Sequence, residues 1–158
     1  MLVEKLILFC INNQMYGINV DYVSAIESVT DIVRVPNAPS NIEGIINLRG
    51  SVIPVYSLHK KFNTKLDDAK RESQLIITRS EDNEFAFMVD AVDEIHILSE
   101  DQCLETPELL KTEETAYIAG IANVNNTLVL CIDVNELMSE ADKKKMKNFV
   151  EQMSGKDE

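Results

Sequence analysis

Arg49 is the residue in this sequence whose type and position most clearly suggest a chemical role. It stands in EGIINLRGSVIPVYSL, residues 43–58, between two apolar runs. This stretch predicts two strands joined at Arg49-Gly50, where Gly50 can adopt the positive φ of a tight hairpin. Two interpretations are open. Arg49 is either a solvated turn residue worth at most ~1 kcal/mol, or an anchor in a protein interface worth about 2 kcal/mol or more.

Residues suited to catalysis or metal binding are present, but their spacing matches no catalytic or metal motif. His59 and His96 lie in different halves of the chain, and neither has the spacing of a metal ligand. His59 precedes two lysines on a stretch typical of a surface, and His96 alternates with Ile95 and Ile97, so we expect His96 to face solvent. No glycine-rich phosphate loop or nucleophile elbow occurs. The sequence therefore predicts no enzyme, no cofactor and no metal site.

The three cysteines, Cys10, Cys103 and Cys131, are widely separated, odd in number and without a CxxC motif. This pattern is typical of reduced thiols in a cytoplasmic protein. Cys10 and Cys131 lie inside apolar segments, so we expect both to be buried core residues that react slowly.

Composition and charge exclude several classes of function. With 158 residues, 45% of them hydrophobic, the chain can form one domain, or two small lobes sharing a core. Its formal charge of −12 repels phosphate backbones and anionic lipid. It has four tyrosines, five phenylalanines, no tryptophan and no basic stripe, which argues against nucleic-acid binding. The apolar run after Lys5 is too short to span a bilayer, so we expect no membrane insertion.

The elements that must position Arg49 are predicted to be mainly β. Short apolar or alternating segments, separated by turn residues, indicate successive hairpins. The predicted strands are residues 6–12, 15–20, the two arms of 43–58, 75–80, 84–92, 94–98, 118–124 and 127–133. The polar residues 63–73 are expected to form a surface connection. Residues 134–153 show helical periodicity with a break near Ser139, and the chain end should be disordered.

An internal repeat organises these strands. At a constant offset, Gly44 aligns with Gly120 and Asn47 with Asn123, and the order of elements agrees between about residues 4–66 and 74–140. The repeat predicts two small, five-stranded, β-barrel-like (SH3-like) lobes sharing a core, followed by a C-terminal helix. Where the first copy has Arg49-Gly50, the second has the neutral pair Asn125-Asn126. The charge at Arg49 is therefore not needed to close the hairpin.

The same segments carry a resemblance to a known family. GIINLRGSVIPVYSL resembles the signature of the CheW family, the coupling proteins of bacterial chemotaxis. The segments YGINVDYV, RVPNAP, FMVDAVDEI and YIAGIANVNNTLVLCIDVNELM agree with it. The resemblance implies a CheW-like domain over residues 4–140, with a helical extension and tail at 141–158, and the two-lobed fold that the repeat predicts.

The resemblance also implies a function. Family members are non-catalytic adaptors that couple the cytoplasmic tip of methyl-accepting chemoreceptors to the regulatory domain of the CheA histidine kinase. The expected location is the cytoplasm, at receptor arrays on the inner face of the membrane. The competing hypotheses are an adaptor of the receiver-fused kind, against which the absence of a receiver domain argues, and a small β-barrel module that binds a ligand or nucleic acid.

Candidate partner-binding residues follow from the resemblance. For the receptor face they are Val20, Val23, Glu27, Gly44, Asn47, Arg49 and Gly50. For the kinase face, expected in the second lobe, they are Phe85, Ala86, Phe87 and Gly120. For Gly120, a tight turn within its own lobe is an equally weighted alternative.

The chain departs from the family pattern at two positions. Ala25 stands where many members have a glutamate that can pair with the hairpin arginine. Glu27 lies on the same strand face if the segment is extended, which makes it a candidate to replace that glutamate. Ser57 stands where the family usually has aspartate, which puts a buried cap or hydrogen bond in the first lobe in question.

Overall fold

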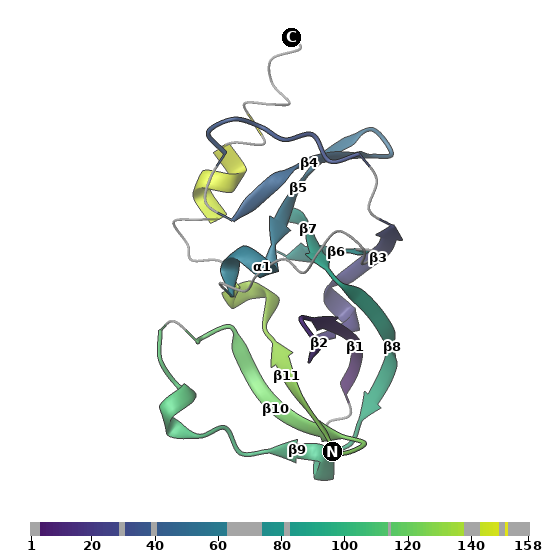
Figure 1. The fold of residues 1–158 in the computed structure, drawn as a ribbon, viewed down its shortest axis with the longest axis vertical. Helices are drawn as coiled ribbons and strands as arrows, with labels where there is room; N and C mark the ends of the chain where they lie inside the picture. Colours follow the sequence, from purple (N-terminus) through teal and green to yellow (C-terminus); the bar gives the residue numbers. More distant parts are fainter. Residues whose placement is uncertain are drawn as a thin grey trace.

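The structure is a computed structural model that describes residues 4–28, 31–38, 41–62, 74–80, 83–113, 115–137, 143–148 and 151. Strands dominate it (Figure 1). They are β1 (Glu4–Ile11), β2 (Gln14–Asn19), β3 (Val23–Ser28), β4 (Ile42–Leu48), β5 (Ser51–Ser57), β6 (Gln74–Ser80), β7 (Asn83–Val89), β8 (Ala91–Leu98), β9 (Cys103–Leu104), β10 (Ile118–Val124) and β11 (Thr127–Ile132).

The helices in the described ranges are short. They are α1 (Leu58–Lys61), the 3-10 helices η1 (Val20–Tyr22), η2 (Glu100–Gln102), η3 (Glu108–Leu110) and η4 (Val134–Glu136), and a C-terminal helix at residues 143–148. The predicted connection at 63–73 and the predicted break near Ser139 lie outside the described residues, as does most of the tail.

The strands form two sheets, which confirms the prediction of a mainly β fold with two lobes. One sheet has five strands in the order β3-β6-β7-β5-β4, and the other has six in the order β8-β1-β2-β11-β10-β9. Both sheets have edge strands, so they are barrel-like without being closed barrels. The two-residue strand β9 adds to the six-stranded sheet a strand that the repeat did not predict.

The two halves of the sequence exchange hairpins between the sheets. The hairpin β1–β2 comes from the first half, but it lies between β8 and β11 of the second half. Conversely, the hairpin β6–β7 of the second half lies between β3 and β5 of the first. Each exchange is completed by one parallel pairing, β2 with β11 and β7 with β5. The sequence repeat and the spatial lobes are therefore different divisions of the chain.

A shared core joins the two sheets. It contains Phe9 and Tyr16 from the hairpin β1–β2, Tyr56 and Phe87 from the five-stranded sheet, and Met146 from the C-terminal helix. Each sheet also encloses a smaller apolar cluster of its own. The strand β1 contributes to two clusters, because alternate residues of a strand point to opposite faces. Burial of both faces explains why its sequence is a continuous apolar run.

Polar contacts strengthen the junction between the sheets. His59, in α1, is buried, and its Nε2 lies 2.6 Å from Asp90 Oδ1. The other carboxylate oxygen of Asp90 accepts a hydrogen bond of 2.7 Å from the backbone N–H of Asn12, in the β1–β2 turn. The sequence interpretation of His59 as part of a surface stretch was wrong, because the local lysine pattern does not report that α1 packs between the sheets.

Ser57 stands where the family usually has aspartate, and it still forms the buried cap that this difference had put in question. It is fully buried, and its side-chain oxygen accepts a hydrogen bond of 3.2 Å from the backbone N–H of Lys60 at the start of α1. Asp133 makes the equivalent cap in the second copy, accepting from the N–H of Asn135 at 3.0 Å. A hydroxyl and a carboxylate both serve as N-caps, so the substitution preserves the local fold.

Gly44 is required by a close backbone approach. A Cβ atom at this position would lie 2.3 Å from the carbonyl oxygen of Val33, whose segment bridges to Ile45. We expect Gly44→Ala to lower the free energy of unfolding by about 1–3 kcal/mol, because the backbone must shift. Denaturant unfolding measures this. Gly120→Ala is the matched control, since a Cβ there meets nothing within 4 Å; equal stability losses in the two variants would contradict the assignment.

Candidate protein interaction surfaces

The tip of the β4–β5 hairpin holds Arg49 in a conformation that arginine does not favour. Leu48 pairs with Ser51, so the turn consists of Arg49 and Gly50, with φ values of 53° and 89°. Two successive positive φ values define a type I′ turn, for which asparagine and glycine are the preferred residues. Asn47 supports the turn, because its Oδ1 accepts a hydrogen bond of 2.9 Å from the N–H of Gly50.

Two other two-residue hairpin turns among the described residues use the preferred residues. Asn12-Asn13 and Asn125-Asn126 adopt positive φ at both positions. A left-handed conformation costs a non-glycine residue roughly 1–2 kcal/mol, and asparagine tolerates it best. Arg49 is therefore in a backbone conformation that arginine does not favour. The equivalent turn of the second copy has asparagine, the residue that stability alone would select at this position. Such departures are concentrated at functional sites.

Glu27, the candidate to replace the family carboxylate at Ala25, lies beside Arg49. Arg49 Nη2 is 3.7 Å from Glu27 Oε1, with 79% of the arginine side chain and 35% of the glutamate side chain exposed. Glu27 is on β3 and Arg49 follows β4, which are opposite edges of the five-stranded sheet. The contact shows that the sheet curls until its edges approach. At this exposure the ion pair contributes little to stability.

The other predicted receptor residues are partly or fully buried, and they support the exposed residues at the hairpin tip. Val20 and Val23 are partly buried against the shared core. Gly44 is buried beneath the segment that carries Val33. The structure brings together four of the predicted residues as an accessible surface, which we call the hairpin-tip surface: Glu27, Asn47, Arg49 and Gly50.

The predicted kinase-face residues on β7 need correction. Phe85, Ala86 and Phe87 are all buried, with Ala86 and Phe87 in different core clusters. Because β7 is a central strand of the five-stranded sheet, both of its faces are covered, and these side chains are not available to a partner. They also lie in a different sheet from Gly120, so the four predicted residues do not form one site.

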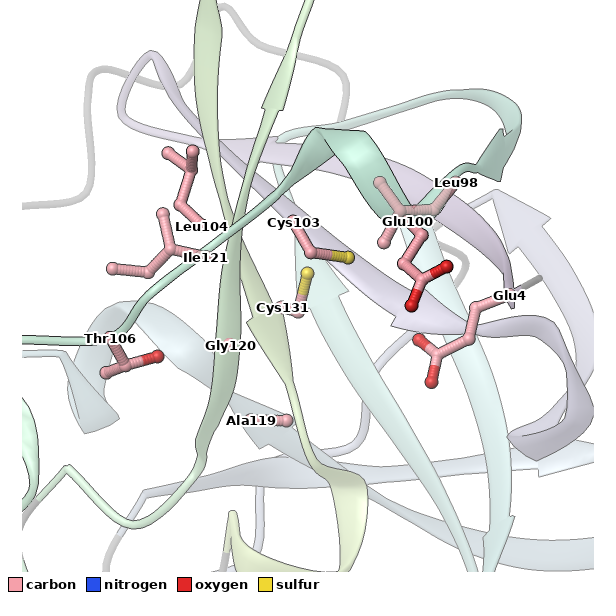
Figure 2. Close-up of a pocket in the computed structure, with 10 residues that line it drawn as sticks. All are labelled: Glu4, Leu98, Glu100, Cys103, Leu104, Thr106, Ala119, Gly120, Ile121 and Cys131. Carbon is pink, nitrogen blue, oxygen red and sulfur yellow. The ribbon is translucent and has the colours of Figure 1, made fainter. Parts of the chain in front are cut away.

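Gly120 lies at an open cavity in the six-stranded sheet (Figure 2). It is an interior residue of β10, opposite Cys131, and not part of a turn, so the tight-turn alternative is excluded. The cavity has a volume of about 380 Å³. We call it the Gly120 cavity. It is lined by Glu4, Leu98, Glu100, Cys103, Leu104, Thr106, Ala119, Gly120, Ile121 and Cys131.

The Gly120 cavity is mostly apolar, with two carboxylates. Figure 2 shows the Glu4 and Glu100 side chains together on one side of it and the two cysteine sulfurs near its centre. Burial, with smaller contributions from Glu4 and Cys103, raises the pKa of the Cys131 thiol to about 11. Cys131 is only half-buried and Cys103 is exposed. An apolar recess beside carboxylates is suited to receive an apolar side chain flanked by a basic one.

Sequence reasoning missed exposed apolar residues on β8. Ile95 and Ile97 are 63% and 59% exposed, whereas His96 between them is half-buried, with Nε2 3.1 Å from Gln102 Oε1. The expectation that His96 faces solvent was therefore wrong. Alternation shows which residues share a face, but it does not show which face of an edge strand is covered. Exposed isoleucines on an edge strand are suited to protein contacts.

Neither a metal centre nor a membrane span is found in the part of the chain that the structure describes. Within the described ranges, no three His, Cys, Asp or Glu side chains are grouped so that they could bind a metal ion. No helix formed by these residues has the length and apolar composition needed to cross a bilayer.

Two sheets with exposed side chains at the hairpin tip and on β8, and an open cavity at Gly120, are an arrangement suited to protein interactions. A family model described as the CheW-like domain matches residues 5–142, and the chain belongs to this family. It is 32% identical over 137 residues to the chemotaxis protein CheW of Bacillus subtilis, covering 87% of this chain and 88% of the relative. It is 28% identical over 151 residues to CheW of Treponema pallidum, covering 92% and 88%.

A solved structure and a CheA protein extend these comparisons. The crystal structure of the scaffolding protein TtCheW from Thermoanaerobacter tengcongensis matches with a TM-score of 0.77 and 29% identity, over 88% of this chain and 90% of that one. The chemotaxis protein CheA of Borreliella burgdorferi is 35% identical over 98 residues, which are 61% of this chain and 11% of CheA. Family membership makes the protein a chemotaxis adaptor and not an enzyme.

Proposed function

We propose that this adaptor couples the cytoplasmic tip of a methyl-accepting chemoreceptor to the regulatory domain of the CheA histidine kinase. It would act in the cytoplasm, at receptor arrays on the inner face of the membrane. The observation that carries the proposal is Arg49, which is kept at φ 53° where the equivalent turn of the second copy has Asn125. An exposed charged residue at a turn position where asparagine would be more stable favours a role in recognition.

The receptor contact is assigned to the hairpin-tip surface. Glu27 holds one side of the Arg49 guanidinium at 3.7 Å, and most of the arginine remains exposed. The guanidinium has five N–H donors in a planar fork, so it can keep Glu27 and still bind a carbonyl or carboxylate on a receptor helix. Orientation by Glu27 reduces the conformational entropy that Arg49 loses on binding.

The kinase contact is assigned to the Gly120 cavity, in the other sheet. The absence of a side chain at Gly120 leaves open space at its surface, which allows a partner to approach closely. CheA contains a segment similar to this chain, so the kinase can supply a surface of related shape. Two contact surfaces in two different sheets let both partners bind at once, as an adaptor requires.

The kinase assignment is tested by filling the Gly120 cavity. We expect Gly120→Leu to weaken binding of the CheA regulatory domain by roughly thirtyfold, about 2 kcal/mol, because the leucine occupies the space that a partner side chain needs. The free energy of unfolding should change by no more than about 0.5 kcal/mol, because the new Cβ meets no atom within 4 Å. Isothermal titration calorimetry and thermal melts measure the two quantities.

Gly120→Ala is the matched control for this experiment. It adds a Cβ without filling the cavity, so kinase affinity should stay within about threefold of the wild-type value. Receptor binding should be unchanged in both variants. Wild-type kinase affinity of a folded Gly120→Leu protein would place the kinase contact elsewhere on the molecule.

A further inference from the structure

Two thiols face the same cavity from strands on either side of Gly120. Cys103, in β9, pairs with Ala122 of β10, and Cys131, in β11, pairs with Gly120 of the same strand. Gly120 and Ala122 are two residues apart, so the four side-chain positions share one face of the sheet. Ala122 is fully buried, which identifies this face as the inner one. Figure 2 shows the two sulfur atoms near each other in this view, and both cysteines line the cavity.

The two thiols differ in exposure. Cys103 is exposed, and its Sγ has one weak contact, 3.8 Å from the carbonyl oxygen of Ser99. Cys131 is less accessible, and burial raises the pKa of its thiol to about 11, so it is protonated at neutral pH. Because Cys103 is the more accessible of the two thiols, a peroxide reaches it first, and Cys103 is the first of the pair to be oxidised.

We propose that Cys103 and Cys131 form a hydroperoxide-sensitive pair whose disulfide closes the Gly120 cavity. The regulatory part of this proposal rests on the proposed function of the cavity as the kinase contact. The Cys103 thiolate attacks the terminal oxygen of the hydroperoxide, giving a sulfenic acid and releasing the alcohol, or water from hydrogen peroxide. The Cys131 sulfur then attacks the Cys103 sulfur, loses its proton and expels water. Two thiols are oxidised by two electrons and the peroxide is reduced by two.

β10 lies between β9 and β11, so forming the disulfide requires β9 to leave its pairing with β10 and to fold over the inner face of Gly120 toward β11. Strands two positions apart are separated by roughly 9.5 Å, and the partners of the two cysteines, Ala122 and Gly120, are two residues or roughly 7 Å apart along β10, so the two Cα atoms are about 12 Å apart. Cα atoms joined by a disulfide lie at most about 7 Å apart. β9 is the element able to move, because it is an edge strand of two residues joined to β10 at only two register positions, Cys103 and Leu104. Gly120 has no side chain to obstruct the approach. The movement removes the open space of the cavity.

The experiment treats the reduced full-length protein with hydrogen peroxide and maps its thiols by mass spectrometry. We expect a loss of two hydrogen atoms from the intact protein and a cross-linked peptide joining Cys103 to Cys131. Cys131→Ser should instead accumulate sulfenic acid at Cys103, detected with dimedone. Cys103→Ser should leave Cys131 unmodified over the same period. Oxidation of wild-type Cys103 without a cross-link, or a disulfide between two chains, would overturn the pairing.

A binding measurement tests the regulatory part separately. Oxidised wild-type protein should bind the kinase regulatory domain roughly tenfold or more weakly than reduced wild-type protein, with recovery after reduction by dithiothreitol. Cys131 lines the cavity, so Cys131→Ser is compared only with itself: peroxide treatment should change its kinase affinity by less than about threefold, whatever the affinity of the untreated variant. Receptor binding should not respond to oxidation. If the disulfide forms and kinase affinity does not change, the regulatory part is refuted. If the reduced protein fails to bind the kinase, the proposed function fails, whereas the cross-link result stands on its own.

Discussion

Replacing Arg49 by asparagine should weaken receptor binding by roughly thirtyfold, about 2 kcal/mol, without destabilising the protein. Asparagine is the residue that the equivalent turn uses at Asn125, with φ 52° against 53° for Arg49. It accepts the left-handed conformation at lower cost, so the free energy of unfolding should stay equal or rise by up to about 1 kcal/mol. Loss of the exposed contact with Glu27 offsets only part of this gain.

The measurement is calorimetric titration of a receptor tip fragment into each variant, with denaturant unfolding in parallel. Affinity for the kinase regulatory domain is the internal control and should not change. If Glu27 orients Arg49, the double variant Glu27→Ala, Arg49→Asn should lose less affinity than the sum of the two single losses. A large drop in stability, or equal losses toward both partners, would make Arg49 a structural residue.

Separating the two halves of the chain should abolish folding of both. A fragment of residues 1–68 contains β3 and β5 but lacks β6 and β7, which lie between them. A fragment of residues 69–158 contains β8 and β11 but lacks β1 and β2, which lie between those strands. Each fragment is left with hairpins or a short sheet and one unpaired strand, and isolated hairpins are marginally stable in water. Near-UV circular dichroism and thermal melts of each fragment should show no cooperative transition.

Mixing the fragments is the control for this experiment. The exchanged hairpins have complementary partners in the other fragment, so an equimolar mixture should recover near-UV signal and a cooperative melt. The sum of the separate fragment spectra provides the baseline. Cooperative melting of each fragment alone would mean that the sheets do not depend on the exchange of β1–β2 and β6–β7.

Local features of the fold were predictable because neighbouring residues encode them. Asn12-Asn13 and Asn125-Asn126 are each flanked by apolar runs, and asparagine pairs are specific for turns with positive φ. The contact between Glu27 and Arg49 was predictable through the family pattern, although its geometry depends on the curl of the five-stranded sheet. The prediction of two lobes was correct, although each lobe contains strands from both copies of the repeat.

The exchange of hairpins was not predictable, because strand patterns do not specify which strand pairs with which. The same limit explains the misplacement of Phe85 and Phe87. Three consecutive apolar residues on β7 indicate a strand that is buried on both faces. Their side chains could face a partner only if β7 were an edge strand, but β7 lies inside the five-stranded sheet. The cavity at Gly120 depends on residues from β1, β8, β9, β10 and β11, whose proximity arises only from the tertiary fold.

The most direct test of two separate contact surfaces is a bridging measurement. A receptor tip fragment is immobilised, the adaptor is added, and retention of the CheA regulatory domain is recorded by surface plasmon resonance. The wild-type adaptor should retain the kinase domain, Arg49→Asn should retain neither adaptor nor kinase, and Gly120→Leu should be retained without the kinase. Competition, in which the kinase domain displaces the wild-type adaptor from the receptor fragment, would contradict an adaptor that binds both partners at once.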